Sequence, residues 1–286
     1  MARPTGSPTV RRRQLAAELR RLREDRNLGI EQVAEQLDWH PTKLSRFETA
    51  RRAIQPSDAR ALLGIYGVGP AERDALLALA REARQRGWWH AYGPAVPEWF
   101  EVYVGLESAA SSLQIYEGEF VPGLLQTADY IRAVHRASLL DASSEDIEQR
   151  VAVRLTRQKL LTSEGAPNVS MVMDEAVIRR VVGGSEVMHA QLQRLLDAAD
   201  LRNVTLQVLP FAVGAHPAMD GAFHVLGFAP TDPCVVYIEY HTGTLYLEKQ
   251  HEVNRYTVMF DRLREAALSV DESSALIQQV ARDLPA

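Results

Sequence analysis

The sequence predicts an α+β protein in which an all-α domain of five helices precedes a domain of helices and a small, mainly antiparallel sheet. Apolar residues recur at helical spacing through the first 86 residues, whereas strand-like apolar runs begin only near residue 169. Two glycines and two prolines fall within the eleven residues from Gly87 to Pro97. We therefore expect domains at 1–86 and 99–286, joined by an aromatic, Gly/Pro-rich connector at 87–98.

The five N-terminal helices are predicted from apolar stripes and from prolines at helix starts. The first helix carries Leu15, Leu19 and Leu22 at spacings of four and three residues, which places them on one face. Proline suits the first helical turn because its missing N–H would have no partner there. The predicted helices cover residues 11–26, 30–37, a third segment beginning at Pro41, 56–66 and 70–84.

The second domain is predicted to combine helices with short strands. Runs of β-branched and other apolar residues bounded by turn residues indicate strands at 169–173, 204–209, 223–228, 235–240 and 244–247. Thr242-Gly243 suggests a hairpin between the last two strands. The expected helices cover 98–115, 123–139, 144–162, 185–199, 252–268 and 272–283.

The composition is that of an ordinary globular protein, with 46% hydrophobic and 24% charged residues among 286. The one cysteine, Cys234, cannot form an internal disulfide, which fits a reducing compartment. No run approaches about 18 apolar residues, and no apolar stretch follows the basic residues at the N-terminus. We therefore expect a cytoplasmic protein that does not enter a membrane.

The charge is unevenly distributed. The first 90 residues hold 17 Lys and Arg against 11 Asp and Glu, whereas the remainder holds 15 against 26. A basic segment joined to an acidic one indicates two tasks, of which one faces a polyanion. The alternative is that the uneven charge arose by chance. The sequence motifs must therefore show whether the basic segment binds a polyanion.

The spacing of the second and third helices is that of a helix-turn-helix motif, which presents its second helix to the major groove of double-stranded DNA. Ala34 is small where the two helices would cross, and Trp39 supplies an apolar side chain in the three-residue turn. Leu44 and Phe47 are expected to point inward. The side chains expected on the outer face are Thr42, Lys43, Ser45, Arg46 and Thr49.

These outward residue types suit DNA, because Lys and Arg bind phosphate or guanine, and hydroxyl groups bind phosphate or base edges. Arg51 and Arg52 follow the third helix, and Arg11 and Arg12 open the first, so all four are expected to add phosphate contacts. A helical bundle with a merely solvated polar face is the alternative interpretation.

Several positions agree with a known family at fixed spacing: Leu22-Arg23-Glu24, Ile30-Glu31-Gln32-Val33-Ala34-Glu35-Gln36-Leu37, Thr42-Lys43-Leu44-Ser45-Arg46-Phe47-Glu48 and Arg51-Arg52. On these residues the segment 14–68 resembles the XRE (Cro/repressor) class of helix-turn-helix regulators. The resemblance implies an internal ion pair between Arg23 and Glu48. The chain departs from the family pattern at Ile30, which cannot hydrogen-bond phosphate, and at His40, a weaker helix cap.

The second domain contains the segment 107–127, with Phe120-Val121-Pro122-Gly123-Leu124-Leu125-Gln126-Thr127, and also Met173-Asp174-Glu175-Ala176, Val208-Leu209-Pro210-Phe211 and Gly221-Ala222-Phe223. On these residues it resembles the C-terminal domain of actinobacterial, WhiJ-like XRE regulators, which is sometimes described as antitoxin-like. The resemblance implies a regulatory setting, and with it a small protein partner, but it names no ligand.

The second domain offers little catalytic chemistry. The histidines of its strand region, His216, His224, His241 and His251, lack the close spacing of metal ligands, and no Gly-x-Ser-x-Gly or phosphate-binding glycine loop occurs. We therefore expect no enzyme activity, no cofactor and no metal.

Basic residues form a stripe at Arg150, Arg154, Arg157 and Lys159. The stripe could bind an anion, but pairing with Glu145, Asp146 and Glu148 is the more ordinary interpretation.

The sequence thus predicts a sequence-specific DNA-binding transcriptional regulator, expected to act as a homodimer because one recognition helix contacts few base pairs. Its C-terminal domain is expected to sense a small-molecule effector or a small protein partner. Two alternatives remain: an enzyme that the N-terminal helices direct to DNA, and an antitoxin-like protein that mainly binds a small partner and autoregulates its own operon.

Overall fold

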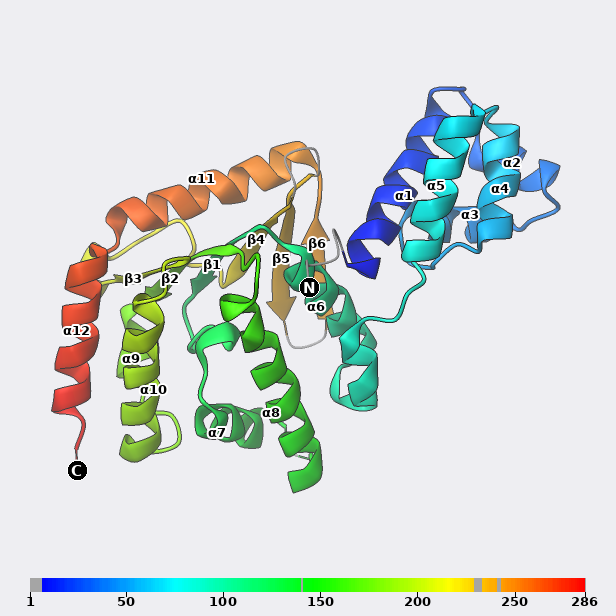
Figure 1. Ribbon diagram of the computed structural model, residues 1–286. Coiled ribbons are helices and arrows are strands. Elements are labelled where there is room, and N and C mark those ends of the chain that lie inside the picture. The colour runs from blue at the N-terminus through cyan, green and yellow to red at the C-terminus, as the bar shows by residue number, and fades with distance from the viewer. Residues whose placement is uncertain (1–6, 140, 229–232, 241–242, 286) are drawn as a thin grey trace. The chain divides into compact units, whose positions relative to one another are not determined.

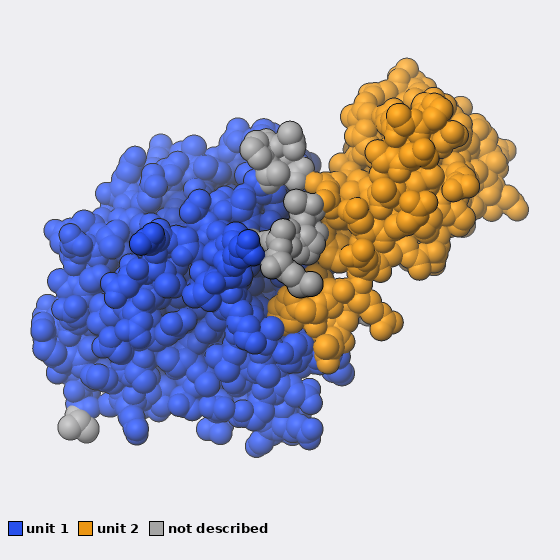
Figure 2. All heavy atoms as spheres, in the orientation of Figure 1, with its two compact units in different colours: residues 1–3, 92–286 blue, residues 4–91 orange. Residues whose placement is uncertain are grey.

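The computed structural model describes residues 7–139, 141–228, 233–240 and 243–285, and the chain divides into two compact units between Ala91 and Tyr92 (Figures 1 and 2). This division falls inside the segment 87–98 that we expected to connect two domains. A 3-10 segment, Trp88–Ala95, occupies that region, with Gly93 at a φ of 51°. Each unit has its own core, and each is described by itself below.

The N-terminal unit is all α. Pro8, Pro41, Pro56 and Pro70 each take the first position of a helix, where proline's missing N–H removes no hydrogen bond. The helices within the described residues are α1 (Pro8–Glu24), α2 (Ile30–Gln36), α3 (Pro41–Glu48), α4 (Pro56–Ile65) and α5 (Pro70–Glu82). The stripe of Leu15, Leu19 and Leu22 is buried in their shared core, as its spacing predicts.

The C-terminal unit is α+β, which confirms the predicted fold class. Its α-helices are α6 (Glu98–Ala109), α7 (Ala128–Ser138), α8 (Ser144–Gln158), α9 (Glu175–Arg179), α10 (Ser185–Ala199), α11 (Gln250–Ala266) and α12 (Val270–Asp283). Short 3-10 turns lie at Gly123–Leu125, Lys159–Thr162 and Phe211–Val213. Helix α8 and the turn at Lys159–Thr162 together cover the expected helix 144–162.

The described strands form one mixed sheet in the order β3-β2-β1-β4-β5-β6. The strands are β1 (Ser112–Glu117), β2 (Asn168–Asp174), β3 (Val204–Leu209), β4 (Phe223–Gly227), β5 (Val235–Tyr240) and β6 (Gly243–Leu247). Strand β1 pairs in parallel with β2, and β2 with β3, whereas the pairings β1–β4, β4–β5 and β5–β6 are antiparallel. Antiparallel pairing therefore prevails on one side of β1 only.

Helix α11 lies across one face of the sheet (Figure 1). It buries Val253, Phe260 and Leu263 in a cluster with Val225 and Val236, which are register partners on β4 and β5. Because side chains alternate along a strand, His224 and Tyr237, also register partners, face the opposite side. That opposite side holds the polar network described below.

Two expected helices are corrected by the structure. The expected helix 98–115 ends at Ala109, and Ser112–Glu117 forms the central strand β1, where the alternating Leu113 and Ile115 are both buried. The expected helix 123–139 breaks at Gln126, which has extended backbone, and restarts after Thr127, whose hydroxyl accepts a hydrogen bond from the Tyr130 N–H. Strands β5 and β6 pair as a hairpin, although Thr242 of its turn lies outside the described residues.

Candidate nucleic-acid interface

Helices α2 and α3 are joined by a short turn with a defined backbone geometry. The Trp39 N–H donates to the Ala34 carbonyl at 2.8 Å, and the Asp38 N–H donates to the Glu35 carbonyl at 3.1 Å. Asp38 has a φ of 53°, a left-handed conformation that aspartate tolerates better than most residues. This turn reverses the chain between the two helices, as a helix-turn-helix motif requires.

The inner face of α3 is fixed by apolar contacts. Leu44 is fully buried and Phe47 nearly so. Trp39 lies edge-on to Phe47, with ring centroids 6.0 Å apart, and is itself partly buried against the same core. Ala34 is fully buried where α2 meets α3. The rotation of α3 about its own axis is therefore set by packing.

The opposite face of α3 is open to solvent. Thr42, Arg46 and Thr49 are exposed and Ser45 is half-buried. The Thr49 hydroxyl donates to the Ser45 carbonyl at 2.7 Å, which leaves its oxygen able to accept. An exposed guanidinium beside short hydroxyl side chains is the residue set that contacts DNA phosphates and base edges.

Lys43 is oriented differently from its neighbours on α3. Its ammonium lies 3.1 Å from Asp58 Oδ1 of α4 and 3.6 Å above the Trp39 ring. Its side chain is 29% exposed. Although Lys43 was expected on the outer face, its charge in the free protein is already matched by Asp58 and Trp39.

The outlying arginines divide into two groups. Arg51 and Arg52 are exposed just beyond α3, and the Arg52 N–H donates to the Arg46 carbonyl at 3.2 Å. Arg11 and Arg12 are half-buried in the first turns of α1, and Arg11 Nε lies 3.1 Å from Glu82 of α5. The structure therefore places the first pair beside α3.

The second pair lies farther away. Arg11 lies twelve positions before Arg23, which pairs with Glu48 of α3, and this span corresponds to about 18 Å of helix. Arg11 and Arg12 precede the helix-turn-helix motif closely in the sequence, but this closeness did not show how far they lie from α3.

Arg23 and Glu48 form a buried bidentate ion pair. Arg23 Nε and Nη2 donate to the two Glu48 oxygens at 2.8 and 2.9 Å, and Arg23 Nη1 donates to the Leu28 carbonyl at 2.8 Å. The hydrogen bond to Glu48 is the main cause that raises the pKa of Arg23. This pair joins the end of α1 to the end of α3.

The residues that differ from the XRE pattern lie at the starts of α2 and α3. Gly29 precedes α2, and its N–H donates to Gln32 Oε1 at 3.1 Å. Ile30 packs partly buried against the core, so it contributes apolar area rather than a polar contact. His40 caps α3, because its Nδ1 accepts a hydrogen bond from the Thr42 N–H at 3.2 Å.

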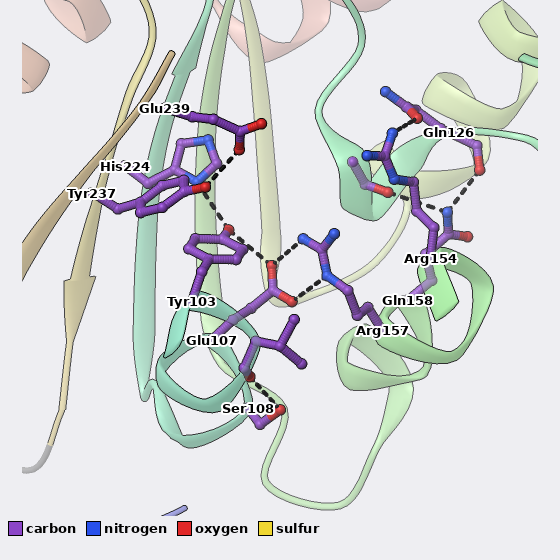
Figure 3. A network of polar contacts seen from close by, with 12 residues as sticks. Tyr103, Glu107, Ser108, Gln126, Arg154, Arg157, Gln158, His224, Tyr237 and Glu239 are labelled. Atoms are coloured by element: carbon purple, nitrogen blue, oxygen red, sulfur yellow. Dashed lines mark hydrogen bonds and ion pairs between the residues drawn. The ribbon is translucent and has the colours of Figure 1, made fainter. Parts of the chain in front are cut away.

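The C-terminal unit holds a buried polar network on the sheet face opposite α11 (Figure 3). Arg157 of α8 donates to both oxygens of Glu107 at 2.8 and 2.7 Å. The Tyr103 hydroxyl donates to Glu107 at 2.9 Å and lies 2.9 Å from His224 Nδ1, whose Nε2 is 3.1 Å from Glu117. The network thus links α6, α8, β1 and β4.

The basic stripe on α8 does not pair as its sequence neighbours suggested. Glu148 bonds Arg132 of α7 instead, and Asp146 bonds Ser143 at the start of α8. Arg157 bonds Glu107, and Arg154 donates to Gln126 at 2.6 Å. The expected pairing is therefore wrong for Glu148, Arg154 and Arg157, whose partners come from other elements. The pKa of Asp146 is nevertheless lowered, first by its hydrogen bonds with Ser143 and then also by the charge of Arg150.

Within the described ranges, no group of three His, Cys, Asp or Glu side chains is placed to hold a metal ion. His216 lies near the Tyr116 hydroxyl and His224 belongs to the polar network, while His241 lies outside the described residues. None of the helices that the structure describes is both long and apolar enough to cross a membrane.

Comparison with known families matches both units. A helix-turn-helix domain model matches residues 14–76, which include α2, α3 and the Arg23–Glu48 pair. A domain of unknown function, DUF5753, matches residues 100–279, more than half of the chain. The chain belongs to the DUF5753 family. No match was found among curated proteins or among solved structures.

The helix-turn-helix domain makes the N-terminal unit a DNA-binding domain of the kind found in transcriptional regulators. The DUF5753 domain contains the whole polar network around Arg157 and Glu107. The family assignment names neither a ligand nor a partner.

Apart from the Arg23–Glu48 pair, which the XRE resemblance implied, sequence reasoning missed the contacts that join distant parts of the chain. Tyr103 and Glu107 are four residues apart on α6, a spacing that could have suggested a shared polar face. Nothing in the sequence links Glu107 to Arg157, fifty residues later, or Lys43 to Asp58 on another helix. Such pairings depend on how helices pack.

Proposed function

We propose that this chain is a sequence-specific transcriptional regulator of the XRE class that inserts α3 into the major groove of operator DNA. The open face of α3, with Arg46 and Thr42 exposed and Leu44 and Phe47 buried behind them, is the observation that carries the proposal. Nothing in the described N-terminal unit covers these two side chains.

The roles of the cations follow from their surroundings. Arg46 is free to reach a base edge, and a bidentate contact with guanine fits its geometry. Arg51 and Arg52 lie just beyond the helix and suit phosphate contacts that fix the position of α3 on the duplex. Lys43 contributes only where phosphate replaces Asp58 as its partner.

The C-terminal domain, in this proposal, is of the WhiJ-like kind and acts by binding an effector rather than by catalysis. The buried polar network on one sheet face supports a binding role. The regulator acts in the cytoplasm, where its DNA target lies, and as a homodimer, because two recognition helices on paired half-sites supply the affinity and length of sequence that one helix lacks.

Selection from random-sequence duplexes tests the DNA-binding proposal. The full chain should enrich one sequence, and Arg46→Ala should lose that sequence or enrich a different one. Arg81→Ala is the matched control, because Arg81 is exposed on α5, which packs against α1 and α4. Equal enrichment by wild type and Arg46→Ala, or no enrichment at all, would contradict the proposal.

A further inference from the structure

Arg154 of α8 is a half-buried cation without a carboxylate partner. Its Nη1 donates to Gln126 Oε1 at 2.6 Å, which is a neutral acceptor. Among the residues that the structure describes, Glu239, Glu117 and Glu107 act on its guanidinium only through space, without a hydrogen bond. Burying a guanidinium without a counter-charge costs free energy, so this unmatched charge requires a physical explanation.

Arg157 lies next to Arg154 and increases the positive charge there. Its bonds to Glu107 use Nε and Nη2, and neither uses Nη1. A methyl group at Gly123 would lie 3.7 Å from Arg157 Nη1 and 3.9 Å from Arg154 Nε. Both guanidiniums therefore border Gly123, where even a methyl group would touch them.

The nearest carboxylates are engaged elsewhere. Glu117 accepts from His224, and Glu239 accepts from the Tyr237 hydroxyl at 2.5 Å. Figure 3 shows Glu239 on one side of the Arg157–Glu107 pair and Arg154 on the other. These carboxylates lower the local potential but do not form a contact with Arg154.

Burial disfavours the charged form of two groups here, and neighbouring arginines add to the effect. The pKa of Arg154 is lowered to about 10, first by burial and then by the charge of Arg157, although Glu239, Glu117 and Glu107 act against this. The pKa of His135 on α7 is lowered to about 4, first by burial and then by Arg154 and Arg150. In both groups the charged form is disfavoured.

The loop beside the two arginines is held in place before any ligand arrives. Gln158 Nε2 donates to the Gln126 carbonyl at 2.7 Å and to the Gly123 carbonyl at 3.3 Å. Gln126 Nε2 in turn donates to the Val121 carbonyl at 2.6 Å. Side chains supported in this way lose little entropy when a ligand binds.

We propose that Arg154 and Arg157 bind the anionic group, a carboxylate or a phosphate, of a small-molecule ligand of the DUF5753 domain. Guanidinium N–H groups match both anions, and the anion supplies the counter-charge that Arg154 lacks. That this ligand is the effector rests on the proposed function, whereas the binding of the anion does not depend on DNA.

Calorimetric titration of the full chain with inorganic phosphate, and separately with acetate, tests the site. Wild type should bind at least one of them, and the two titrations distinguish phosphate from carboxylate ligands. Arg154→Met should bind the same anion at least tenfold more weakly. Arg136→Met should bind the anion as wild type does. Arg136 is exposed on α7, and its substitution removes the same charge as Arg154→Met does. No heat with either anion, or equal binding by wild type and Arg154→Met, would overturn the proposal.

A melting curve in anion-free buffer separates a ligand-binding role from a structural one. Arg154→Met should melt at or above the temperature of wild type, because the substitution removes an unmatched buried charge. A lower Tm for Arg154→Met would show that Arg154 stabilises the fold through its own neighbours, contrary to the proposal. In anion-free buffer, Arg154→Met should select the same DNA sequence as wild type. DNA binding and anion binding are therefore tested independently, and either proposal can fail without the other.

Discussion

The Lys43 ammonium of α3 lies 3.1 Å from Asp58 of α4, whereas Arg46, one turn along the same helix, is exposed. In the free protein, one cation of the candidate recognition helix is therefore paired and the other is open to solvent. Arg46 reaches DNA at no cost in protein contacts, while Lys43 must give up Asp58 and the face of Trp39.

This difference predicts unequal effects of two substitutions. Arg46→Ala should weaken operator binding by about 1–3 kcal/mol and alter base preference. Lys43→Ala should weaken operator binding less than Arg46→Ala. Lys43 must give up its pairing with Asp58 to contact DNA, so removing its side chain removes that penalty together with the contact. Fluorescence anisotropy with the selected duplex measures both. An equal loss of affinity in the two variants would show that Lys43 gives up Asp58 without an energetic penalty.

Asp58→Asn should strengthen DNA binding, because it frees the Lys43 ammonium for phosphate while preserving the shape of the side chain. The slope of log K against log salt should steepen by about one phosphate contact. Asp74→Asn, an exposed carboxylate on α5, is the matched control for the change of charge. If both variants shift the slope equally, the effect is one of net charge rather than of the Lys43–Asp58 pair.

Glu48→Ala should destabilise the N-terminal unit by about 3–5 kcal/mol, since it leaves Arg23 buried without a counter-charge. The double variant Arg23→Met with Glu48→Leu should recover much of that loss, because neither charge then remains buried. Hydrogen exchange of α1 and α3 amides measures the stability of this unit within the full chain. Wild-type exchange rates in Glu48→Ala would contradict the structural role of the pair.

Tyr66 is fully buried at the end of α4, and its hydroxyl has no hydrogen-bond partner within the described residues. Burial is the main cause that raises its pKa, followed by Glu48. Tyr66→Phe should therefore leave stability unchanged or raise it by up to about 1 kcal/mol, because it removes an unsatisfied polar atom. A fall in hydrogen-exchange protection of α4 would indicate that the hydroxyl has a stabilising partner.

The pKa of His135, lowered to about 4, makes stability depend on pH. The unfolded chain protonates this histidine near its ordinary pKa of 6.5, whereas the folded chain does so only near 4. His135 therefore contributes stability above pH 6.5, and this contribution is lost as pH falls from 6.5 towards 4. The full shift corresponds to about 3 kcal/mol, which solvent screening reduces because the ring is half-buried.

His135→Gln should flatten this part of the pH profile, measured by urea unfolding between pH 4 and 7. His189→Gln, on α10, serves as the control for the loss of a histidine. A parallel profile for wild type and His135→Gln would show that other groups produce the dependence.

Local patterns predicted the N-terminal helices well, because prolines and leucine stripes act within one or two turns. Strand β1 was missed because only residues 110–112, which include two serines but no Gly or Pro, separate Leu113 and Ile115 from an apolar helix. The interruption at Gln126 was missed because Gln191 and Gln158 of other helices hold that loop.

The outer face of α3 was predicted from helical geometry alone, and the exposure of Arg46 follows from the burial of Leu44 and Phe47. The restraint on Lys43 was not predictable, since Asp58 reaches it only through the packing of α4. No acidic residue lies three or four positions from Arg154 on α8, but whether another element supplies a carboxylate depends on helix packing and was not predictable.

Arginine modification by phenylglyoxal, read by mass spectrometry with and without the selected duplex, tests the central claim most directly. If α3 enters the major groove, bound DNA should protect Arg46, with Arg51 and Arg52, while Arg81 on α5 reacts as before. Equal modification of Arg46 in the free and the bound protein would contradict the assignment of α3 as the recognition helix.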